Sequence, residues 1–120
     1  MTILKTKINK KSSSYKKNFD NLNELVSDLK KKTRIIKIGG TQESRKRHIK
    51  RGKILPRERI NYLLDKGVEG LEVGQLAGFE LNNDETPSGS IITVIGKVSG
   101  RDSMIIANDA TVKGGTYYRI

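Results

Sequence analysis

The sequence predicts an α/β fold in which several helices precede a β-hairpin. Residues 91–98 and 104–107 are rich in β-branched and apolar side chains and flank the turn-forming residues 99–102, a pattern typical of two antiparallel strands joined by a short loop. Upstream, apolar side chains recur at helical spacing between residues 20 and 64. The second strand is apolar over residues 104–107, so we expect cover on both of its faces, as in a layered structure.

That second strand also indicates that the chain is incomplete. The sequence offers only short helices before it, and only a short segment follows Ala107. These elements do not suffice to cover both faces of a buried strand. We therefore expect the missing layers to come from polypeptide outside residues 1–120.

Composition narrows the classes of function. The chain has 120 residues, of which 34% are hydrophobic and 5% aromatic, so it fits one small domain with a thin core. It has no cysteine and a single histidine, which argues against a disulfide framework or a metal site. No apolar stretch approaches the roughly 20 residues of a membrane span. We expect neither a metal nor a membrane among its partners.

The positive charge is concentrated in the amino-terminal half. The net charge is +11, and residues 1–53 hold 17 Lys and Arg against 4 Asp and Glu. Residues 1–19 form a basic leader with six lysines and no acid. Such a leader is typical of a mitochondrial presequence, of a solvated tail or, less often, of an arm that binds nucleic acid.

Residues 20–67 are predicted to form a helical extension. An apolar stripe indicates a first helix from Asn18 or Asp20 to Lys32, after which residues 35–38 are expected to be extended up to Gly39–Gly40. A polar second helix is predicted from Thr41 to Arg51. Its basic residues 45–51 suit either an acidic partner surface or plain solvent, and His48 has no recognisable catalytic partner.

A third helix is predicted to start at Pro56. Ile60, Leu63 and Leu64 supply its buried stripe, and residues 65–67 are expected to close it with a glycine cap. Residues 68–120 then form the β region, with short strands expected near residues 71–73 and 79–81 and a surface loop over residues 82–89 before the hairpin.

The candidate binding site follows the second hairpin strand, at Lys113, Gly114, Gly115 and Thr116. Backbone N–H groups freed at a strand end, beside a lysine, can bind an anion or polarise a carbonyl group. A plain turn is the competing interpretation of the glycine pair. The sequence contains neither a recognisable nucleophile–base pair nor a phosphate-binding glycine motif.

Three stretches of sequence resemble a known family. They are RHIKRGKILPRERI with the following LLD, LAGFEL, and IANDATVKGGTYY, at residues 47–60 with 63–65, 76–81, and 106–118. The first resembles the opening of the carboxyltransferase (β) subunits of biotin-dependent acyl-CoA carboxylases. The last is most similar to the methylcrotonoyl-CoA branch of that family, whose propionyl and acetyl relatives place an aromatic residue at the position of Lys113. Arg119, Lys66 and Asn82–Asn83 depart from the family pattern.

The resemblance implies a crotonase-like fold, built from stacked ββα layers, with residues 68–120 as the truncated first part of the amino-terminal carboxyltransferase domain. It implies transfer of a carboxyl group from carboxybiotin to 3-methylcrotonoyl-CoA in leucine catabolism, with oxyanions held by backbone N–H groups of glycine loops. Those principal loops lie beyond residue 120 in the family. The fragment is therefore expected to be inactive alone, with no catalytic side chain of its own.

The resemblance also implies the partners and the location. Biotin is carried on a partner α subunit, the β subunits form a hexamer, acyl-CoA is the substrate, and the compartment is the mitochondrial matrix. Residues 113–116 are expected near the CoA moiety, and residues 47–53 and 57–59 in packing between subunits or domains. The alternative is a small basic module that binds nucleic acid through its lysine-rich arm. The apolar, nearly neutral hairpin argues against that alternative.

Overall fold

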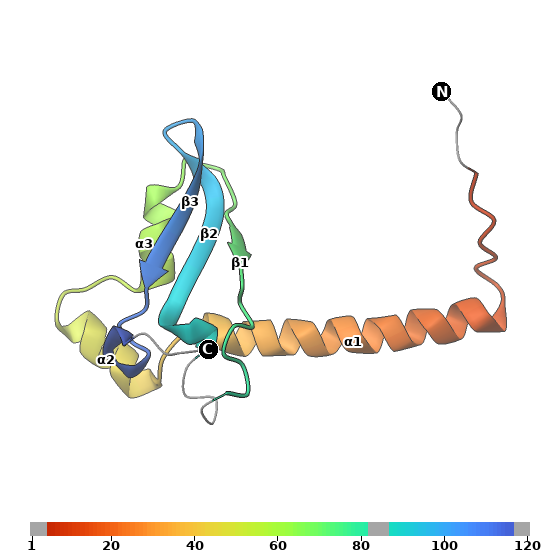
Figure 1. Cartoon of the computed structure of the whole chain (residues 1–120), viewed down its shortest axis with the longest axis horizontal. Helices are drawn as coiled ribbons and strands as arrows, with labels where there is room; N and C mark the ends of the chain where they lie inside the picture. The colour runs from red at the N-terminus through yellow and green to blue at the C-terminus, as the bar shows by residue number, and fades with distance from the viewer. Residues whose placement is uncertain (1–4, 82–86, 117–120) are drawn as a thin grey trace. The chain divides into compact units, whose positions relative to one another are not determined.

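The computed structural model describes residues 5–81 and 87–116. The chain divides into two units, residues 1–32 and residues 33–120. The helices and strands follow one another in the order shown in Figure 1. Within the described residues, no helix combines the length and the apolar character needed to cross a bilayer.

Helix α1 extends from Ser13 to Lys37 and is longer than the predicted 20–32 at both ends. It starts early because Ser12 caps it: the main-chain N–H of Tyr15 donates to Ser12 Oγ at 3.2 Å. At the other end, the predicted extended piece over residues 35–38 is wrong. Ile36 is a buried helical residue, 3% exposed, and the helix stops at Gly39, whose φ of +79° is the left-handed conformation of a glycine cap.

Helix α2 confirms the prediction for the second helix. It spans Gln42–Lys50 with Thr41 as its N-cap, whose Oγ1 accepts the main-chain N–H of Ser44 at 3.2 Å. Arg51 is its C-cap. The helix has no buried residue, and Ile49 is 56% exposed, as its polar sequence suggested.

Helix α3 begins at Pro56, as predicted, but ends at Leu63. Glu58 accepts the main-chain N–H of Leu55 at 3.3 Å and so stabilises the first turn. Ile60 is buried, whereas Leu63 is 50% exposed and does not belong to the buried stripe. The predicted glycine cap is also wrong, because Leu64 already has extended backbone and Gly67 lies in a separate turn beyond it.

The sheet has three antiparallel strands in the order β1–β2–β3, namely Leu71–Val73, Ile91–Val98 and Arg101–Asn108. Ser99 and Gly100 form a two-residue turn with φ of 52° and 76°, the conformation that matches the twist of a hairpin. The strand predicted near residues 79–81 is wrong: this segment is a series of turns, with φ of 73° at Gly78 and 61° at Glu80.

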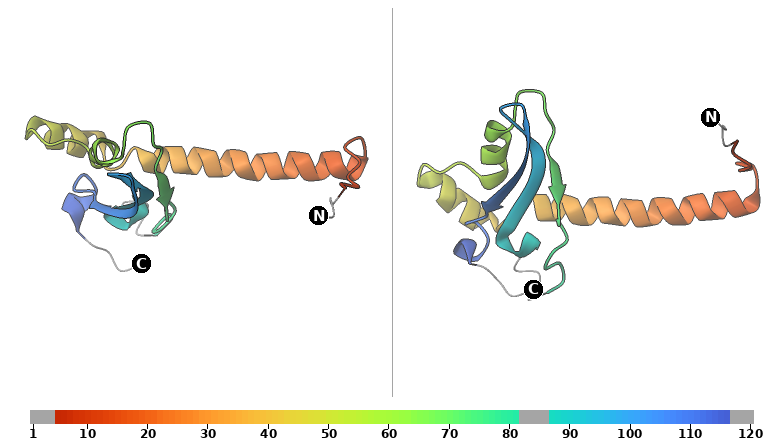
Figure 2. Two further views of the ribbon diagram at one scale, coloured as in Figure 1. Left: turned by 90° about the horizontal axis from the view of Figure 1, so that it is seen from above. Right: turned by 45° about the horizontal axis from the view of Figure 1, so that its top comes forward.

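The core lies on one face of the sheet, which helix α3 covers (Figure 2). Ile60, Ile92 and Val94 form its buried centre, with Leu64, Ile105 and Ala107 packed against it. The opposite face carries Leu71, Ile95, Met104 and Ile106, which are between 40% and 69% exposed. In the described residues, β3 therefore has cover on one face only, and the expected second layer is not among them.

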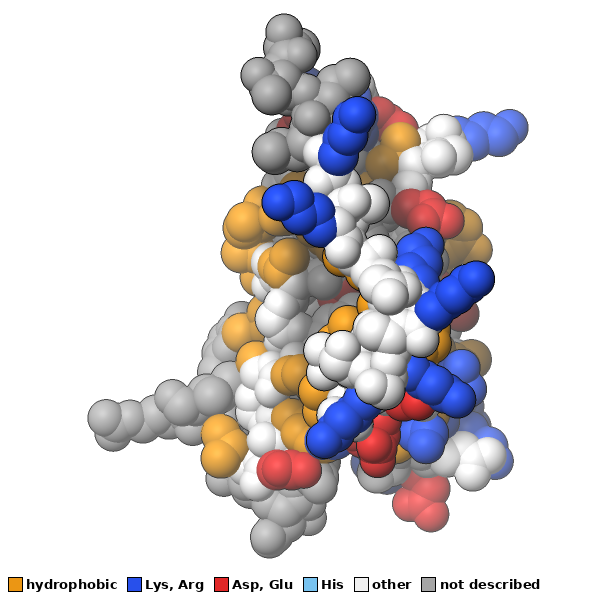
Figure 3. Space-filling view, turned by 90° about the vertical axis from the view of Figure 1, so that its right-hand side faces the viewer, with side chains coloured by type: hydrophobic (Ala, Val, Ile, Leu, Met, Phe, Trp, Pro, Cys, Tyr) orange, Lys and Arg blue, Asp and Glu red, His pale blue; other side chains and the backbone are white. Residues whose placement is uncertain are grey.

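Short turns complete the second unit. The 3₁₀ turn η2 spans Pro87–Ser90 directly before β2, and the 3₁₀ turn η3 spans Lys113–Gly115 after β3. The loop predicted over residues 82–89 lies outside the described residues at 82–86. The space-filling view shows exposed hydrophobic side chains in orange and Lys and Arg side chains in blue (Figure 3).

Candidate functional site

A cavity of about 710 Å³ contains part of the predicted binding loop. Lys113 and Gly114 line it, together with Phe79 and the start of helix α2. The remaining wall comes from the last turn of α1 and from the adjoining Gly39–Gly40. Segments far apart in the sequence thus converge on one hollow of the second unit.

The lining combines positive and apolar groups. Arg47 and Lys113 supply positive charge, and Thr41 and Ser44 bring the N-terminal end of α2 to the wall. The apolar surface comes from Ile35, Ile36, Phe79 and Val112. No Asp or Glu is among the lining residues in the described part of the chain. The cavity therefore suits a ligand with both an apolar portion and an anionic group.

The predicted loop itself is a tight turn. Lys113, Gly114 and Gly115 all have positive φ, at 44°, 72° and 85°. The main-chain N–H of Gly115 donates to Val112 O at 2.8 Å, and Asn108 Nδ2 donates to Gly115 O at 2.8 Å. The N–H of Thr116 donates to Lys113 O at 3.5 Å. The amides of Gly115 and Thr116, which the sequence suggested were freed at the strand end, are thus engaged within the turn.

Of the four predicted site residues, only two line the cavity. Lys113 and Gly114 do so, whereas Gly115 and Thr116 are not among its lining residues. A Cβ at Gly114 would meet no atom within 4 Å, so the backbone faces open space there. Sequence reasoning did not place Thr41, Ser44 and Phe79 at the site. It considered Arg47 only as part of a basic contact surface, and the one available signal was that basic cluster beside a helix start.

One wall is fixed by the buried segment Asp109–Thr111. Asp109 Oδ1 accepts the main-chain N–H of Thr111 at 2.9 Å and its hydroxyl at 2.5 Å. Thr111 Oγ1 in turn accepts the main-chain N–H of Gly40 at 3.0 Å. Asp109 and Thr111 are 4% and 3% exposed. This chain of hydrogen bonds joins the start of α2 to the loop after β3 and so holds the two sides of the cavity together.

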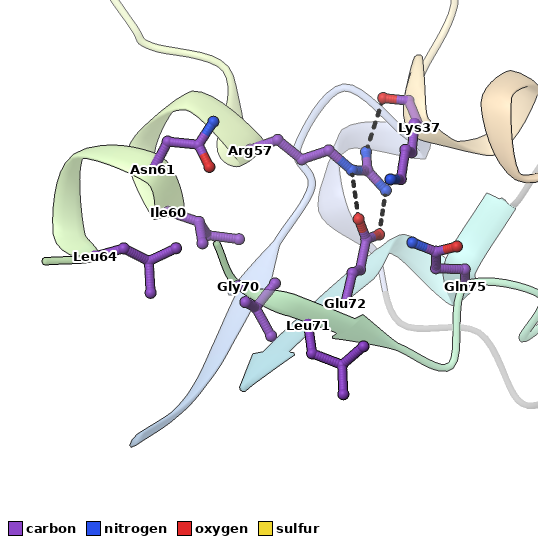
Figure 4. Close-up of a pocket in the computed structure, with 10 residues that line it drawn as sticks. Lys37, Arg57, Ile60, Asn61, Leu64, Gly70, Leu71, Glu72 and Gln75 are labelled. Carbon is purple, nitrogen blue, oxygen red and sulfur yellow. Dashed lines mark hydrogen bonds and ion pairs between the residues drawn. The ribbon is translucent and has the colours of Figure 1, made fainter. Parts of the chain in front are cut away.

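A second hollow, of about 450 Å³, lies between α3 and β1 (Figure 4). Arg57 crosses it and makes a bidentate ion pair with Glu72, at 3.1 Å from Nε to Oε2 and 2.6 Å from Nη2 to Oε1. Its Nη1 also donates to the main-chain O of Lys37 at 3.1 Å. Arg57 thus donates to a main-chain carbonyl in the last turn of α1 and neutralises the carboxylate of Glu72 on β1. These contacts indicate a structural role for this hollow.

Asp65 holds the hairpin turn. Its Oδ1 accepts the main-chain N–H of Ser99 at 2.6 Å, and its Oδ2 accepts that of Gly100 at 2.7 Å. The N–H of Asp65 donates to Lys97 O at 2.9 Å. Sequence reasoning gave Asp65 only a place in a helix end. No group of three or more His, Cys, Asp or Glu side chains suited to a metal occurs among the described residues.

Comparison with known proteins defines the class. The model of the carboxyl transferase domain family matches residues 47–120, and the chain belongs to this family. Two solved structures share its fold at 29% identity. The geranyl-CoA carboxylase beta subunit of P. aeruginosa has a TM-score of 0.65, with 95% of this chain and 21% of that chain covered. Transcarboxylase 12S has a TM-score of 0.67, with 76% and 19% covered.

Within the family, the chain is similar to methylcrotonoyl-CoA carboxylase beta chains. It is 48% identical over 119 residues to the probable mitochondrial beta chain of Drosophila melanogaster, covering 98% of this chain and 21% of that relative. It is 52% identical over 99 residues to the 3-methylcrotonyl-coenzyme A carboxylase beta1 subunit of Mycobacterium tuberculosis, covering 82% and 19%. The chain thus spans about a fifth of the length of these relatives.

Proposed function

We propose that this chain is part of a carboxyltransferase (β) subunit that transfers a carboxyl group from carboxybiotin to 3-methylcrotonoyl-CoA in leucine catabolism. The supporting observation is the similarity to beta chains that bear this substrate in their names, at 48% identity over 98% of the chain. The sheet and helices would form the start of a crotonase-like domain of ββα layers. The exposed face of β3, with Met104 63% exposed, supports a further layer there.

The proposed partners follow from the relatives. Biotin, on a partner α subunit, supplies the carboxyl group when it is bound, and none of the described residues is assigned to hold it. A β-subunit hexamer is supported by transcarboxylase 12S, whose structure is described as a hexamer assembly. Relatives from Drosophila melanogaster, Dictyostelium discoideum and Arabidopsis thaliana are named mitochondrial, which supports the mitochondrial matrix as the compartment.

The cavity around Lys113 and Gly114 is proposed to hold part of the CoA moiety. CoA joins phosphate groups to a long, mostly neutral arm, and the cavity pairs two cationic side chains with apolar walls. Lys113 and Arg47 would attract the phosphates, and the N-terminal end of α2 would add its partial positive charge. In this proposal, the chain binds and orients acyl-CoA, while Gly115 and Thr116 keep the turn in shape.

A chimaeric subunit tests the proposal. The 120-residue chain replaces the matching segment of the Mycobacterium tuberculosis beta1 subunit, and carboxylation of 3-methylcrotonoyl-CoA and of propionyl-CoA is measured with the biotin-carrying partner. We expect activity with a preference for 3-methylcrotonoyl-CoA. A matched chimaera carries the corresponding segment of a propionyl-CoA carboxylase beta chain. Sedimentation confirms that each chimaera assembles, and an assembled chimaera without carboxylation would contradict the proposed function.

A further inference from the structure

Helix α1 carries an exposed apolar seam in residues 15–29, within the first unit. Its positions are four and three residues apart in alternation, namely Tyr15, Phe19, Leu22, Val26 and Leu29. This spacing is the seven-residue repeat that places side chains along one seam of a helix. Phe19, Leu22 and Val26 are 52%, 61% and 38% exposed, and the rings of Tyr15 and Phe19 are stacked with centroids 6.1 Å apart.

The acids of α1 lie away from this seam, whereas lysines lie both beside it and opposite it. At 100° of rotation per residue, Lys16 and Lys30 flank the seam on one side, and Lys32 lies toward its other side. The acids of the helix, Asp20, Glu24 and Asp28, lie opposite the seam, where Lys17 and Lys31 accompany them. The positions that flank the seam therefore include lysines and no acid, and one of these lysines, Lys32, pairs with Asp28 on the same helix at 2.9 Å.

We propose that this seam binds an amphipathic helix of a partner protein whose apolar seam is flanked by Glu and Asp. In paired helices, the residues beside the seam meet each other across the interface and set the choice of partner. A second copy of this chain would bring lysines near lysines, which is unfavourable. A helix with acidic flanks instead forms ion pairs while burying the exposed Phe19, Leu22 and Val26.

The seam favours a helix over a lipid surface. Helices that lie in a membrane interface have a broad apolar face, with basic residues on the polar side. In α1, the side opposite the seam mixes Asp20, Glu24 and Asp28 with Lys17 and Lys31, so it is not the basic polar side that anionic lipids favour. The seam follows the 4–3 spacing of helix pairing, and Leu25, which is 68% exposed, lies at a flanking position beside it. The occupant assigned by these observations is therefore a single helix.

The test uses the full 120-residue chain and two synthetic helices of about four heptads, both with Leu in the seam. One probe has Glu at all flanking positions and the other has Lys. Titration calorimetry should show binding of the Glu-flanked helix at least about tenfold tighter than binding of the Lys-flanked helix. Replacing both Lys16 and Lys30 by Glu should reverse this preference.

Seam variants separate apolar pairing from charge alone. Leu22→Ala with Val26→Ala should weaken binding of the Glu-flanked helix by about tenfold or more, because less apolar surface is buried. Alanine keeps the helix intact, which circular dichroism verifies. The matched control is Ser27→Ala, on the side away from the seam, and it should leave affinity unchanged. Equal affinity for both probes, insensitivity to the seam variants, or binding only to anionic phospholipid vesicles would overturn the proposal. Self-association of the chain in sedimentation without probe binding would also overturn it.

Discussion

The chain contains two glycine pairs, Gly39–Gly40 and Gly114–Gly115, and Gly39, Gly40 and Gly114 line the same cavity. At Gly40, an added Cβ would lie 1.8 Å from the main-chain O of Thr111, so this residue is required for space. At Gly114, an added Cβ would meet nothing within 4 Å, but φ is +72°. Gly40 lets two backbones approach closely, whereas Gly114 lets the chain turn. Identical dipeptides therefore answer two different physical demands.

The largest effect is expected from Gly40→Ala. The new methyl group would force the start of α2 away from Thr111 and break the Gly40–Thr111 hydrogen bond of 3.0 Å. We expect a loss of about 3 kcal/mol in the free energy of unfolding, measured by urea denaturation. Gly52→Ala is the control, because Gly52 has φ of +71° and no atom near its Cβ. Equal losses in the two variants would contradict the close packing.

Asp109→Ala tests the same contact from the other side. Asp109 is buried and accepts both the N–H and the hydroxyl of Thr111, so its removal leaves buried donors unpaired. The expected loss is about 2 kcal/mol. Asp102→Ala, at an exposed position of β3, should stay within about 0.5 kcal/mol in the same denaturation experiment. If both variants unfold at the same urea concentration, Asp109 does not hold this wall.

Gly114→Ala should cost less than Gly40→Ala. Only the left-handed backbone opposes the methyl group, so the expected loss is about 1 kcal/mol. Gly114→Asn should cost less still, because asparagine tolerates this conformation better than alanine. Thermal unfolding of the three proteins gives the order. A Gly114→Ala variant as unstable as Gly40→Ala would remove the distinction between the two pairs.

The smallest effect on stability is expected from Lys113→Gln, within about 0.5 kcal/mol. We expect Lys113→Gln to weaken substrate binding instead. In the chimaeric subunit, the KM for 3-methylcrotonoyl-CoA should rise several-fold with little change in kcat. Lys113→Arg is the control, since it keeps the positive charge at the cavity wall. If Lys113→Gln and Lys113→Arg had the same KM for 3-methylcrotonoyl-CoA, the positive charge at residue 113 would have no part in CoA binding.

Local signals predicted the local elements. Thr41 and Pro56 marked the starts of two helices, and the apolar runs around Ser99–Gly100 marked the hairpin. The predictions of secondary structure were wrong where one sequence pattern is compatible with two structures. Ser12 belonged to a polar leader by composition but caps a helix, and Phe79 and Leu81 looked like a strand although Gly78 and Glu80 turn the backbone there.

The site was harder to predict than the elements. Lys113 and Gly114 were identified from a family resemblance and from their place after a strand. Their neighbours in the cavity could not be identified in that way, because tertiary packing alone brings Thr41 and Thr111 to the same cavity. The hydrogen bond between Gly40 and Thr111 joins residues 71 apart in the sequence. No local pattern encodes such a contact, although Gly39–Gly40 was visible as a glycine pair.

The carboxylate of Asp65 has a consequence for the order of folding. Its two main-chain donors, Ser99 and Gly100, lie 34 and 35 residues further along the chain. During synthesis, α3 and Asp65 leave the ribosome before the hairpin turn does. The carboxylate of Asp65 is therefore solvated by water until Ser99 and Gly100 have been made. The hairpin turn can therefore be joined to the end of α3 only after residue 100 has been synthesised.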